Sequence, residues 1–587
     1  MAISLLSGCV LKKSAYTYEE HNIGEAKGEA LIINELGIAE GPFRPTFKSL
    51  EKFECPEWFR DAKFGLWAHW GAQSMTVAGD WMAQGMYAWE EDKENNIPES
   101  KFLAPNGRYI DLTSEKYGHP SQVGYTKIID MWKAEKFTQK YANELLMLYK
   151  KAGAKYFMAL ANHHDNFDNW DSKHHRWNSI NKGPKKNIVG IWQKASENAG
   201  LKFGLTSHLW RSFDIRGRPD GDSKWDDVWT SYAPQWEDAI RRIRRNGETW
   251  PGTDSWFGIA HQSDPRPGPF QGMPYDGADP KNFDLFHDYD NPEEYNWPKR
   301  WYNRTIDVIG QHRPDLFYLD HQGFMFWEQE IGRKVFAHFF NQGLQKYDGK
   351  QEVVLQLKAH FDPKKDMKGM AILDEEASVL NQILPEPWQT DISLGAWWWS
   401  GEDSGRNSNW VIDILIDIVS KNGNLLLNIP NHPDGHISQK SVETLINVGN
   451  WMEVNGEGIY ATRPWKVFGE GPMYDAVVSG KPTMVKQADE MGNVLRYTKR
   501  KMGAKDIRFT QSKDGKTIYA FLMSWPGNGE KVSISSLKKH LSLEALKSVE
   551  LLGVGQLAWK KSNGNIIIEL PDQAPFKEAV CLKIECR

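Results

Sequence analysis

The sequence is poor in cysteine, in positive net charge and in long hydrophobic runs. Four cysteines in 587 residues are too few for a disulfide framework, and their spacing matches no zinc site. Cys581 and Cys586 lie five residues apart in one predicted strand, so they face opposite sides and are not expected to pair. A formal net charge of −5 argues against a nucleic-acid partner. No segment has the apolar length of a membrane span, which leaves a globular chain long enough for at least two domains.

The segment Leu6-Ser7-Gly8-Cys9 resembles the cleavage box of a bacterial lipoprotein, in which Cys9 would carry the lipid. No basic region precedes it, and the apolar stretch Met1–Leu6 is shorter than a working signal peptide requires. Either the natural start lies upstream or the match arises by chance. The lipoprotein interpretation predicts a membrane tether through Cys9 and a location in the periplasm, at the outer membrane or outside the cell.

Eight short apolar runs, with helical patterns between several of them, predict an α/β fold with a (β/α)8-like TIM barrel over residues 50–464, after a lead-in over 1–49. The link Asp374–Thr390 is too short and proline-rich for a helix, so either the barrel is imperfect there or one run is not a strand. The predicted strands are Phe64–Trp70, Tyr156–Asn162, Lys202–His208, Leu316–Asp320, Glu352–Lys358, Met370–Asp374, Thr390–Ala396 and Asn424–Ile429. The predicted helices are Lys133–Ala152, Ile188–Ala199, Trp327–Tyr347, Trp410–Ser420 and one from its N-cap Ser438 to about Val454.

Two regions depart from this alternation. A long insertion at about 211–300 is rich in proline, glycine, aspartate and tryptophan. It is typical either of a lid or subsite wall on a barrel, or of an arm at a subunit contact in a homo-oligomer. From 465 to 587 helical periodicity gives way to short alternating runs such as Lys516–Met523 and Asn565–Leu570, which predict a C-terminal all-β sandwich. The sandwich shows no cluster of reactive residues and is interpreted as accessory.

Polar side chains collect where the predicted strands end, and a barrel gathers such ends into one pocket. A capping or turn role explains any one of these residues as well as function does, but it does not explain six strand ends together. The candidates are His69, His163, His164, Asp165, His208, Asp320, Asp374, Glu375 and Glu376.

Two kinds of chemistry are compatible with such a pocket. Histidine clusters can bind zinc or iron, but adjacent His163 and His164 lack the spacing that directs two imidazoles at one ion, so no metal or other cofactor is expected. Paired carboxylates fit glycoside hydrolysis, which needs a proton donor and a second carboxylate. Asp320 closes an apolar strand, and Glu375 or Glu376 supplies the acid from a neighbouring strand end. In an extended chain these two glutamates point opposite ways, so only one can face the pocket. The 27 tryptophans add weak support for a sugar substrate.

The motifs carry a family resemblance. Over most of residues 50–465, and more weakly into the sandwich, the chain resembles the α-L-fucosidases of glycoside hydrolase family 29. The matching stretches are Trp58–Gly71, Gly79–Tyr87, Ala152–Asp165, Pro314–Asp320, Gly423–Pro430, Gly456–Tyr460 and Arg463–Trp465.

This resemblance implies a retaining exo-hydrolase that removes terminal α-L-fucose, without a metal, from fucosylated oligosaccharides or polysaccharides. It implies Asp320 as the nucleophile. Glu376 matches the acid/base position of several bacterial members, with Glu375 as the fallback. The resemblance also places His69, Trp81, His163 and His164 on the fucose ring and its hydroxyls, and neutral imidazoles can donate and accept hydrogen bonds there.

Three departures from the family pattern leave alternatives open. A tyrosine that often follows Phe-Gly in the third strand is missing, and His208 is its candidate substitute. Gln389 stands where many relatives have a glutamate and cannot be the acid. Lys358 or His360 occupies the region of a family arginine. The alternatives are hydrolysis of a related sugar such as an α-L-galactoside, a non-catalytic carbohydrate-binding barrel, and metal-dependent hydrolysis at the same barrel mouth.

Overall fold

The protein was analysed as a computed structural model. It describes residues 35–79, 103–104, 107–108, 115–118, 125–175, 177–209, 297–320, 330–358, 369–401, 405–479, 484–488, 494–499, 502–562 and 565–587. Cys9, Trp81 and residues 211–296 of the predicted insertion lie outside these ranges. None of the helices that the structure describes has the length and apolar character needed to cross a membrane.

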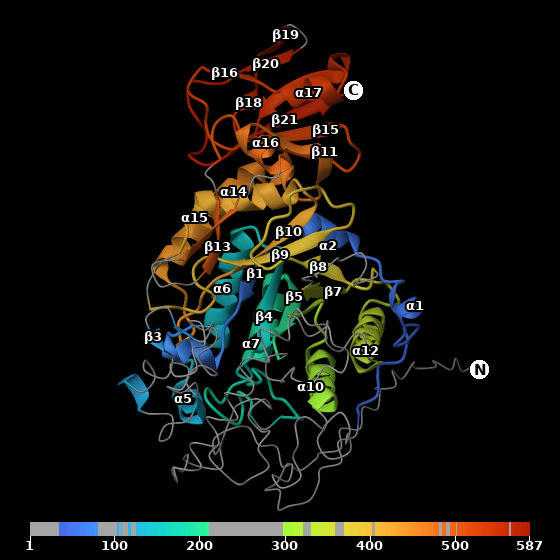
Figure 1. The fold of residues 1–587 in the computed structure, drawn as a ribbon, viewed down its shortest axis with the longest axis vertical. Coiled ribbons are helices and arrows are strands. Elements are labelled where there is room, and N and C mark those ends of the chain that lie inside the picture. The colour runs from blue at the N-terminus through green and yellow to red at the C-terminus, as the bar shows by residue number, and fades with distance from the viewer. Residues whose placement is uncertain are drawn as a thin grey trace, which may run out of the picture.

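Eight parallel strands close into a barrel, as predicted (Figure 1). They are β1 (Phe64–Ala68), β4 (Tyr156–Asn162), β5 (Lys202–Ser207), β6 (Leu316–Leu319), β7 (Val354–Lys358), β8 (Ile372–Asp374), β9 (Trp388–Ser393) and β10 (Gly423–Asn428). Each strand pairs with the next along the chain, and β1 also pairs with β10, which closes the ring. Parallel barrel strands are covered on both faces, which explains why these runs are almost continuously apolar and buried.

Helices pack around the barrel, with polar caps at their first turns (Figure 1). Ser438 is the N-cap of α15 (Gln439–Asn455), and its side chain accepts a hydrogen bond from Ser441 N, as predicted. Gly200 ends α7 (Ile188–Ala199) at a φ of 67°, which glycine adopts without strain. Helix α6 (Gln139–Lys151) is shorter than predicted, because Thr138 caps it. The other helices of this part are α1 (Phe47–Leu50), α2 (Glu57–Ala62), α5 (Tyr125–Met131), α10 (Trp297–His312), α12 (Glu330–Lys346), α14 (Ser408–Val419) and the 3-10 turn η1 (Ala72–Thr76).

The short link between β8 and β9 contains no helix over residues 375–387. Instead, Glu375 N donates to Gln389 O (2.9 Å) and Ala377 N donates to Asp391 O (2.7 Å). The chain that leaves β8 therefore stays hydrogen-bonded to β9, and the barrel closes without a crossover helix at this point. The structure confirms β8 and β9, the two strands that the short link between them made doubtful.

The C-terminal part consists of antiparallel sheets. A six-stranded sheet has the order β11-β14-β15-β21-β17-β18, and a three-stranded sheet has the order β16-β20-β19. One apolar cluster contains residues of both, as the sandwich prediction requires. Cys55, Cys581 and Cys586 are free thiols. The strands of these two sheets are β11 (Arg463–Glu470), β14 (Ile507–Gln511), β15 (Thr517–Leu522), β16 (Lys531–Ser533), β17 (Leu546–Leu551), β18 (Gly555–Gln556), β19 (Trp559–Ser562), β20 (Asn565–Glu569) and β21 (Val580–Cys586). The same part contains the helices α16 (Pro472–Val478) and α17 (Ser535–His540) and a pair formed by β12 (Met484–Ala488) and β13 (Val494–Lys499). A further short pair, formed by β2 (Leu103–Ala104) and β3 (Gly107–Arg108), lies between β1 and β4 in the sequence.

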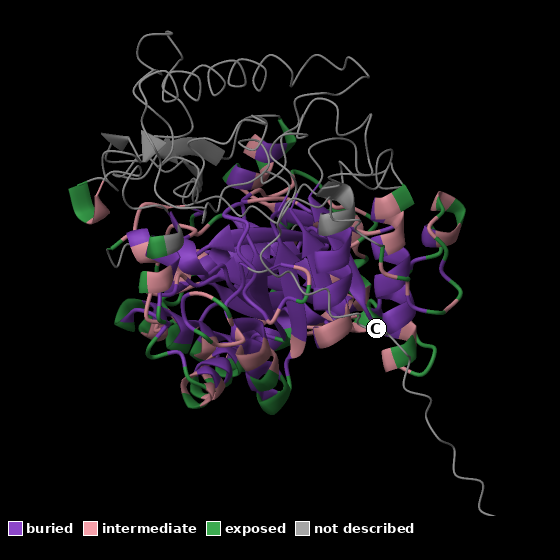
Figure 2. Ribbon diagram, turned by 90° about the horizontal axis from the view of Figure 1, so that it is seen from below, coloured by how far each residue is buried: buried purple, intermediate pink, exposed green. Residues whose placement is uncertain are grey.

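The main hydrophobic core lies in the barrel and continues into the large C-terminal sheet. Figure 2 shows the buried residues gathered in the barrel, with exposed residues at its periphery. Tyr519, Phe521 and Cys581 of the sheet belong to the same cluster of buried side chains as the barrel strands. Barrel and sheet thus share part of one core.

Candidate active site

The carboxyl ends of the barrel strands bring most of the predicted site residues together. His69 follows β1, His163 and His164 follow β4, His208 follows β5, and Asp320 follows β6. All five are at most 5% exposed. Parallel strands end at one rim of the barrel, so residues far apart in the sequence converge here.

Asp320 lies at the centre of this cluster. Its Oδ1 accepts a hydrogen bond from Lys358 Nζ at 2.5 Å, and its Oδ2 lies 3.0 Å from His208 Nδ1 and 4.0 Å from His164 Nε2. The backbone is fixed as well, since Asp320 N donates to Ser207 O at 3.0 Å. A carboxylate held on both oxygens at the end of a barrel strand suits a nucleophile, which needs a fixed direction of attack.

Lys358, the last residue of β7, links the two predicted carboxylates. Its Nζ lies 2.5 Å from Asp320 Oδ1 and 2.9 Å from Glu376 Oε2. Burial opposes the charge of this lysine, but the nearby carboxylates of Asp320 and Glu376 outweigh burial and raise its pKa. From the sequence, Lys358 is only one of two residues in the region of a family arginine, because its contact with both carboxylates depends on how the strands align.

The shared lysine limits the distance between the two carboxylates. The oxygens of Asp320 and Glu376 can lie no farther apart than the sum of their contacts with Lys358 Nζ. This limit is compatible with the separation of about 5 to 5.5 Å between the carboxyl groups of retaining glycosidases. Inverting enzymes place the two groups about 6.5 to 9.5 Å apart to leave room for a water molecule.

The adjacent Glu375 has a different environment. Its side chain forms no ion pair with Lys358 in the part of the chain that the structure describes, whereas that of Glu376 does. Burial raises the pKa of Glu375 to about 6, with a further contribution from the charge of Asp391. The contact with Lys358 therefore favours Glu376 as the partner of Asp320. Glu375 remains the fallback, because a carboxyl with a pKa of about 6 can carry the proton that an acid must donate.

Histidine and tryptophan rings form a wall beside Asp320. The ring of His69 stands edge-on to those of His163 (4.7 Å between centroids), His208 (5.0 Å) and Trp398 (4.9 Å). Gln73 Nε2 lies 2.8 Å from His163 Nδ1. Burial lowers the pKa of His208, although Asp320 opposes this shift. Neutral imidazoles next to tryptophan match the needs of a sugar, which offers hydroxyls on its edge and C–H groups on its faces.

Three of these histidines have the geometry to hold a metal ion. One ring nitrogen each of His163, His164 and His208 lies within 4.8 Å of the others. The expectation that adjacent His163 and His164 could not point at one ion was therefore wrong, because the turn after β4 brings both rings to the same side. The ammonium of Lys358 lies 2.5 Å from Asp320, which also neighbours His164 and His208. Its positive charge opposes the binding of a second cation at this place. The donor set fits sugar hydroxyls better.

Gln389, a departure from the family pattern, lies inside the barrel. Its side chain accepts a hydrogen bond from Tyr156 OH (2.8 Å) and donates one to Asp374 Oδ2 (2.6 Å). It is fully buried and is committed to these two partners. The structure thus agrees that this position does not supply the acid.

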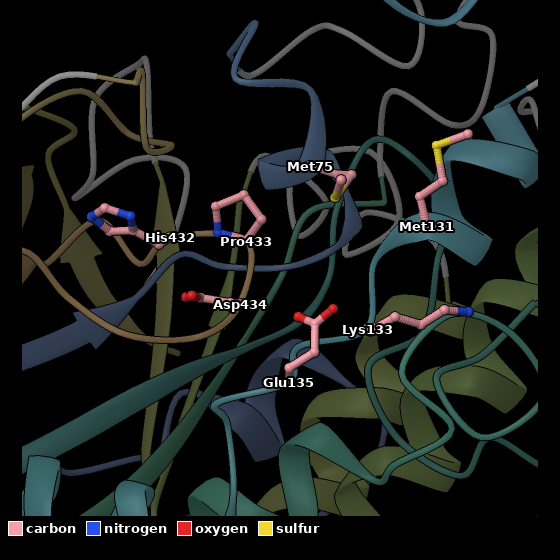
Figure 3. Close-up of a pocket in the computed structure, with 7 residues that line it drawn as sticks. All are labelled: Met75, Met131, Lys133, Glu135, His432, Pro433 and Asp434. Atoms are coloured by element: carbon pink, nitrogen blue, oxygen red, sulfur yellow. The ribbon is translucent and has the colours of Figure 1, made fainter.

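A separate pocket of about 300 Å³ lies near the barrel rim (Figure 3). Figure 3 shows the loop after β10, with His432 and Asp434, facing Met131 and Lys133 across it. His432 stacks on Trp399 with 4.0 Å between centroids. None of its lining residues belongs to the cluster around Asp320, so we do not assign the chemistry to this pocket. Its full lining is Met75, Met131, Lys133, Glu135, His432, Pro433 and Asp434.

Comparisons with known proteins were made for the whole chain. The family model "Alpha-L-fucosidase" matches residues 30–457, and "Alpha-L-fucosidase C-terminal domain" matches residues 499–585. The tissue alpha-L-fucosidase of Rattus norvegicus is 25% identical, over 92% of this chain and 91% of that protein. The plasma alpha-L-fucosidase of Homo sapiens is 24% identical, over 90% and 88%.

Solved structures with the same fold include alpha-fucosidases from bacteria. The Thermotoga maritima alpha-fucosidase in complex with fucose has a TM-score of 0.58 and 21% identity, and the match covers 92% of this chain and 99% of that one. A GH29 alpha-L-fucosidase from Bacteroides thetaiotaomicron has a TM-score of 0.54 and 14% identity, with 96% and 98% covered. At these identities the likeness establishes the fold of the barrel with its C-terminal domain.

Proposed function

The chain belongs to the α-L-fucosidase family of glycoside hydrolases, and we propose that it removes terminal α-L-fucosyl residues from fucosylated oligosaccharides or polysaccharide fragments with retention of configuration. One observation carries the mechanism: a single buried lysine nitrogen contacts both Asp320 and Glu376 at the barrel mouth. Two carboxylates this close support double displacement.

In the first step, Asp320 Oδ attacks the anomeric carbon of the fucosyl residue. The glycosidic C–O bond breaks, and Glu376 donates its proton to the departing oxygen. The product is a covalent fucosyl ester on Asp320 and a free alcohol. Lys358 and His208 hold the attacking carboxylate in place through contacts at 2.5 and 3.0 Å.

In the second step, Glu376 acts as a base. It takes a proton from water, whose oxygen attacks the same anomeric carbon and displaces the Asp320 carboxylate. Two inversions restore the original α configuration. The sugar hydroxyls bind to the histidine rings beside Asp320, which are those of His69, His163, His164 and His208. We propose that Trp81 contributes to the same sugar site.

The role of Asp320 is tested by the variant Asp320→Asn. An amide cannot form the fucosyl ester, so turnover of an aryl α-L-fucoside should fall on the order of 10³-fold or more. The anomer of the first product, followed by NMR with the wild type, should be α. A β product, or wild-type turnover by the variant, would contradict double displacement by Asp320.

The two glutamates are distinguished by matched variants. Glu376→Gln should slow hydrolysis of natural fucosides about 10² to 10⁴-fold, while an aryl fucoside with a good leaving group loses far less in the first step. Glu375→Gln is the control and should show no such dependence on the leaving group. The reverse pattern would assign the acid to Glu375.

A substrate screen tests the alternatives that the departures suggest. Because Lys358 or His360 occupies the region of a family arginine, the screen includes aryl α-L-galactosides beside aryl α-L-fucosides and fucosylated oligosaccharides. Faster hydrolysis of the galactoside would identify an α-L-galactoside as the preferred substrate. Fucose binding without hydrolysis of any glycoside would identify a carbohydrate-binding barrel instead. Loss of activity with a chelator would favour the metal-dependent alternative at the three histidines.

We also propose that Cys9 carries lipid and tethers the enzyme to a bacterial membrane, with the catalytic barrel in the periplasm or outside the cell. The support is the sequence Leu6-Ser7-Gly8-Cys9. Mass spectrometry of the protein expressed from its full native gene should show an N-terminal diacylglyceryl cysteine at Cys9. An unmodified thiol would refute the tether.

A further inference from the structure

The interior of the barrel below the candidate site is unusually polar. Barrel interiors are normally filled by branched aliphatic side chains. Here β8 and β9 contribute Asp374, Gln389 and Asp391, each at most 1% exposed. Isolated ionised carboxylates are costly to bury, so two of them on neighbouring strands require a compensating arrangement.

The hydrogen bonds show what this arrangement is. Gln389 Nε2 donates to Asp374 Oδ2 at 2.6 Å, and Tyr318 OH lies 3.5 Å from Asp391 Oδ2. The Oδ1 atoms of both aspartates are buried and receive no hydrogen bond from other described residues. The two carboxyl groups are hydrogen-bonded to each other. Carboxylates have no donor, so one of the two must carry a proton.

Burial favours Asp374 as the protonated member of the pair. Burial raises its pKa well above the usual range, and the neighbouring charge of Asp391 adds to the shift. Burial also raises the pKa of Asp391, but the ammonium of Lys358 opposes that shift, so Asp391 carries the negative charge. The other titratable groups that act on the pair or feel its charge are Asp320, Glu375, Glu376, Tyr156 and Tyr318.

The pair lies next to the lysine of the site. Lys358 on β7 is the register partner of Asp374 on β8. From this position its ammonium reaches Asp320 and Glu376 at the rim. The lysine thus forms ion pairs with the two carboxylates of the site, and the charge of Asp391 acts on it as well.

We propose that the Asp374–Asp391 pair is a positioning device that holds one proton and one negative charge beneath Lys358. This inference rests on the proposed function, in which Glu376 must be protonated before the leaving group departs. The Lys358 ammonium lies 2.9 Å from Glu376, and the negative charge of the pair acts on the same ammonium. The pair also keeps the ammonium between Asp320 and Glu376, so that both carboxylates retain their separation.

The test is the pH profile of kcat/KM for an aryl α-L-fucoside. In the double variant Asp374→Asn/Asp391→Asn the charge is lost while the shapes are kept. Both limbs of the profile should move to lower pH by about one unit, as expected for one charge removed at close range. Asp374→Asn alone leaves the Asp391 carboxylate and should shift the limbs less. Asp413→Asn, a buried carboxyl on α14, is the control and should not move them.

A second measurement does not depend on activity. Infrared spectra of the wild type at pH 7 should contain the C=O stretch of a buried protonated carboxyl, and this band should disappear in Asp374→Asn. The absence of the band, or a folded double variant with unshifted limbs, would overturn the proposal. A wild type that shows the band but hydrolyses no fucoside would refute the proposed function and leave the shared proton intact.

Discussion

At the scale of the residue, the candidate site is defined by charges that are buried together. Asp320 and Glu376 were predicted from strand ends and from family resemblance, and the structure places both on Lys358. The lysine's function in linking them was not predicted, because a sequence does not show which side chains of different strands meet. Its two ion pairs make it a sensitive point for both catalysis and stability.

Replacing this lysine should move the pH profile in the direction opposite to that of the aspartate variants. In Lys358→Met both Asp320 and Glu376 lose a neighbouring cation, so both limbs of kcat/KM should shift to higher pH. Breaking a buried pair also destabilises by about 3 to 5 kcal/mol. Lys358→Arg keeps the charge and should retain the wild-type limbs, as assayed with an aryl α-L-fucoside. Unshifted limbs in a folded Lys358→Met would contradict this.

Asp165 gives a residue-scale prediction about stability. Burial raises its pKa to about 6, well above the usual range of an aspartate. A group whose pKa is higher in the folded state stabilises below its unfolded pKa, and this stabilisation is lost as the pH rises through 6. Asp165→Asn should therefore gain about 2 to 3 kcal/mol relative to the wild type between pH 4 and pH 7.

Thermal unfolding of both proteins across this pH range measures the Asp165 effect. The control is Asp434→Asn, at a carboxyl whose pKa is lowered mainly through Lys136 and His436 against the effect of burial. The difference in stability between Asp434→Asn and the wild type should change with pH in the direction opposite to that of Asp165→Asn. Parallel curves for wild type and Asp165→Asn would show that Asp165 titrates normally in the folded protein.

At the scale of the element, most strands and helices followed from local patterns. Continuous apolar runs identified all eight barrel strands, and capping residues identified the start of α15 and the end of α7. The start of α6 was misplaced, since a helical pattern extends upstream of the cap at Thr138. The docking of the lead-in segment on α12 was not visible from the sequence, because it depends on side chains of this helix that meet a distant backbone.

Asn341 on α12 makes three of these hydrogen bonds. It accepts a hydrogen bond from Phe43 N (2.9 Å) and donates to Ala39 O (2.9 Å) and Phe43 O (3.0 Å). Asn341→Ala should cost about 2 to 4 kcal/mol, because it leaves these backbone groups without partners. Hydrogen exchange at Phe43 should accelerate strongly, whereas Gln345→Ala, which removes a single exposed contact with Glu40 O, should have little effect. Unchanged protection of Phe43 would show that other contacts hold the segment.

At the scale of the whole molecule, barrel and C-terminal sheet are joined through a buried ion pair as well as the shared core. Arg508 on β14 contacts Asp417 on α14 at 2.5 Å, and Lys421 contacts the same carboxylate at 2.9 Å. Trp451 Nε1 donates to Ala579 O at 2.6 Å across the same boundary. These contacts predict that the two parts unfold together.

Arg508→Met tests this coupling. Loss of the arginine leaves Asp417 buried with less compensation and should destabilise the protein by about 3 to 5 kcal/mol. Calorimetry should show a lower Tm and the onset of separate transitions for sheet and barrel. Lys513→Met is the control, because it breaks an exposed contact with Glu57 and Asp61 across the same boundary and should change stability by less than about 1 kcal/mol. Equal effects of the two variants would contradict a special role of the buried pair.

The sequence by itself determined the eight strands, the C-terminal sheets, the family and the strand-end residues, because periodicity, caps and motifs are local properties of the chain. Only the tertiary structure decided which of these residues meet. The register of β6, β7 and β8 places Lys358 between Asp320 and Glu376, and that of β8 and β9 places Asp374 beside Gln389, two residues before Asp391. Such contacts depend on distances between strands that are remote in sequence, and those distances decide which protons and charges the site holds.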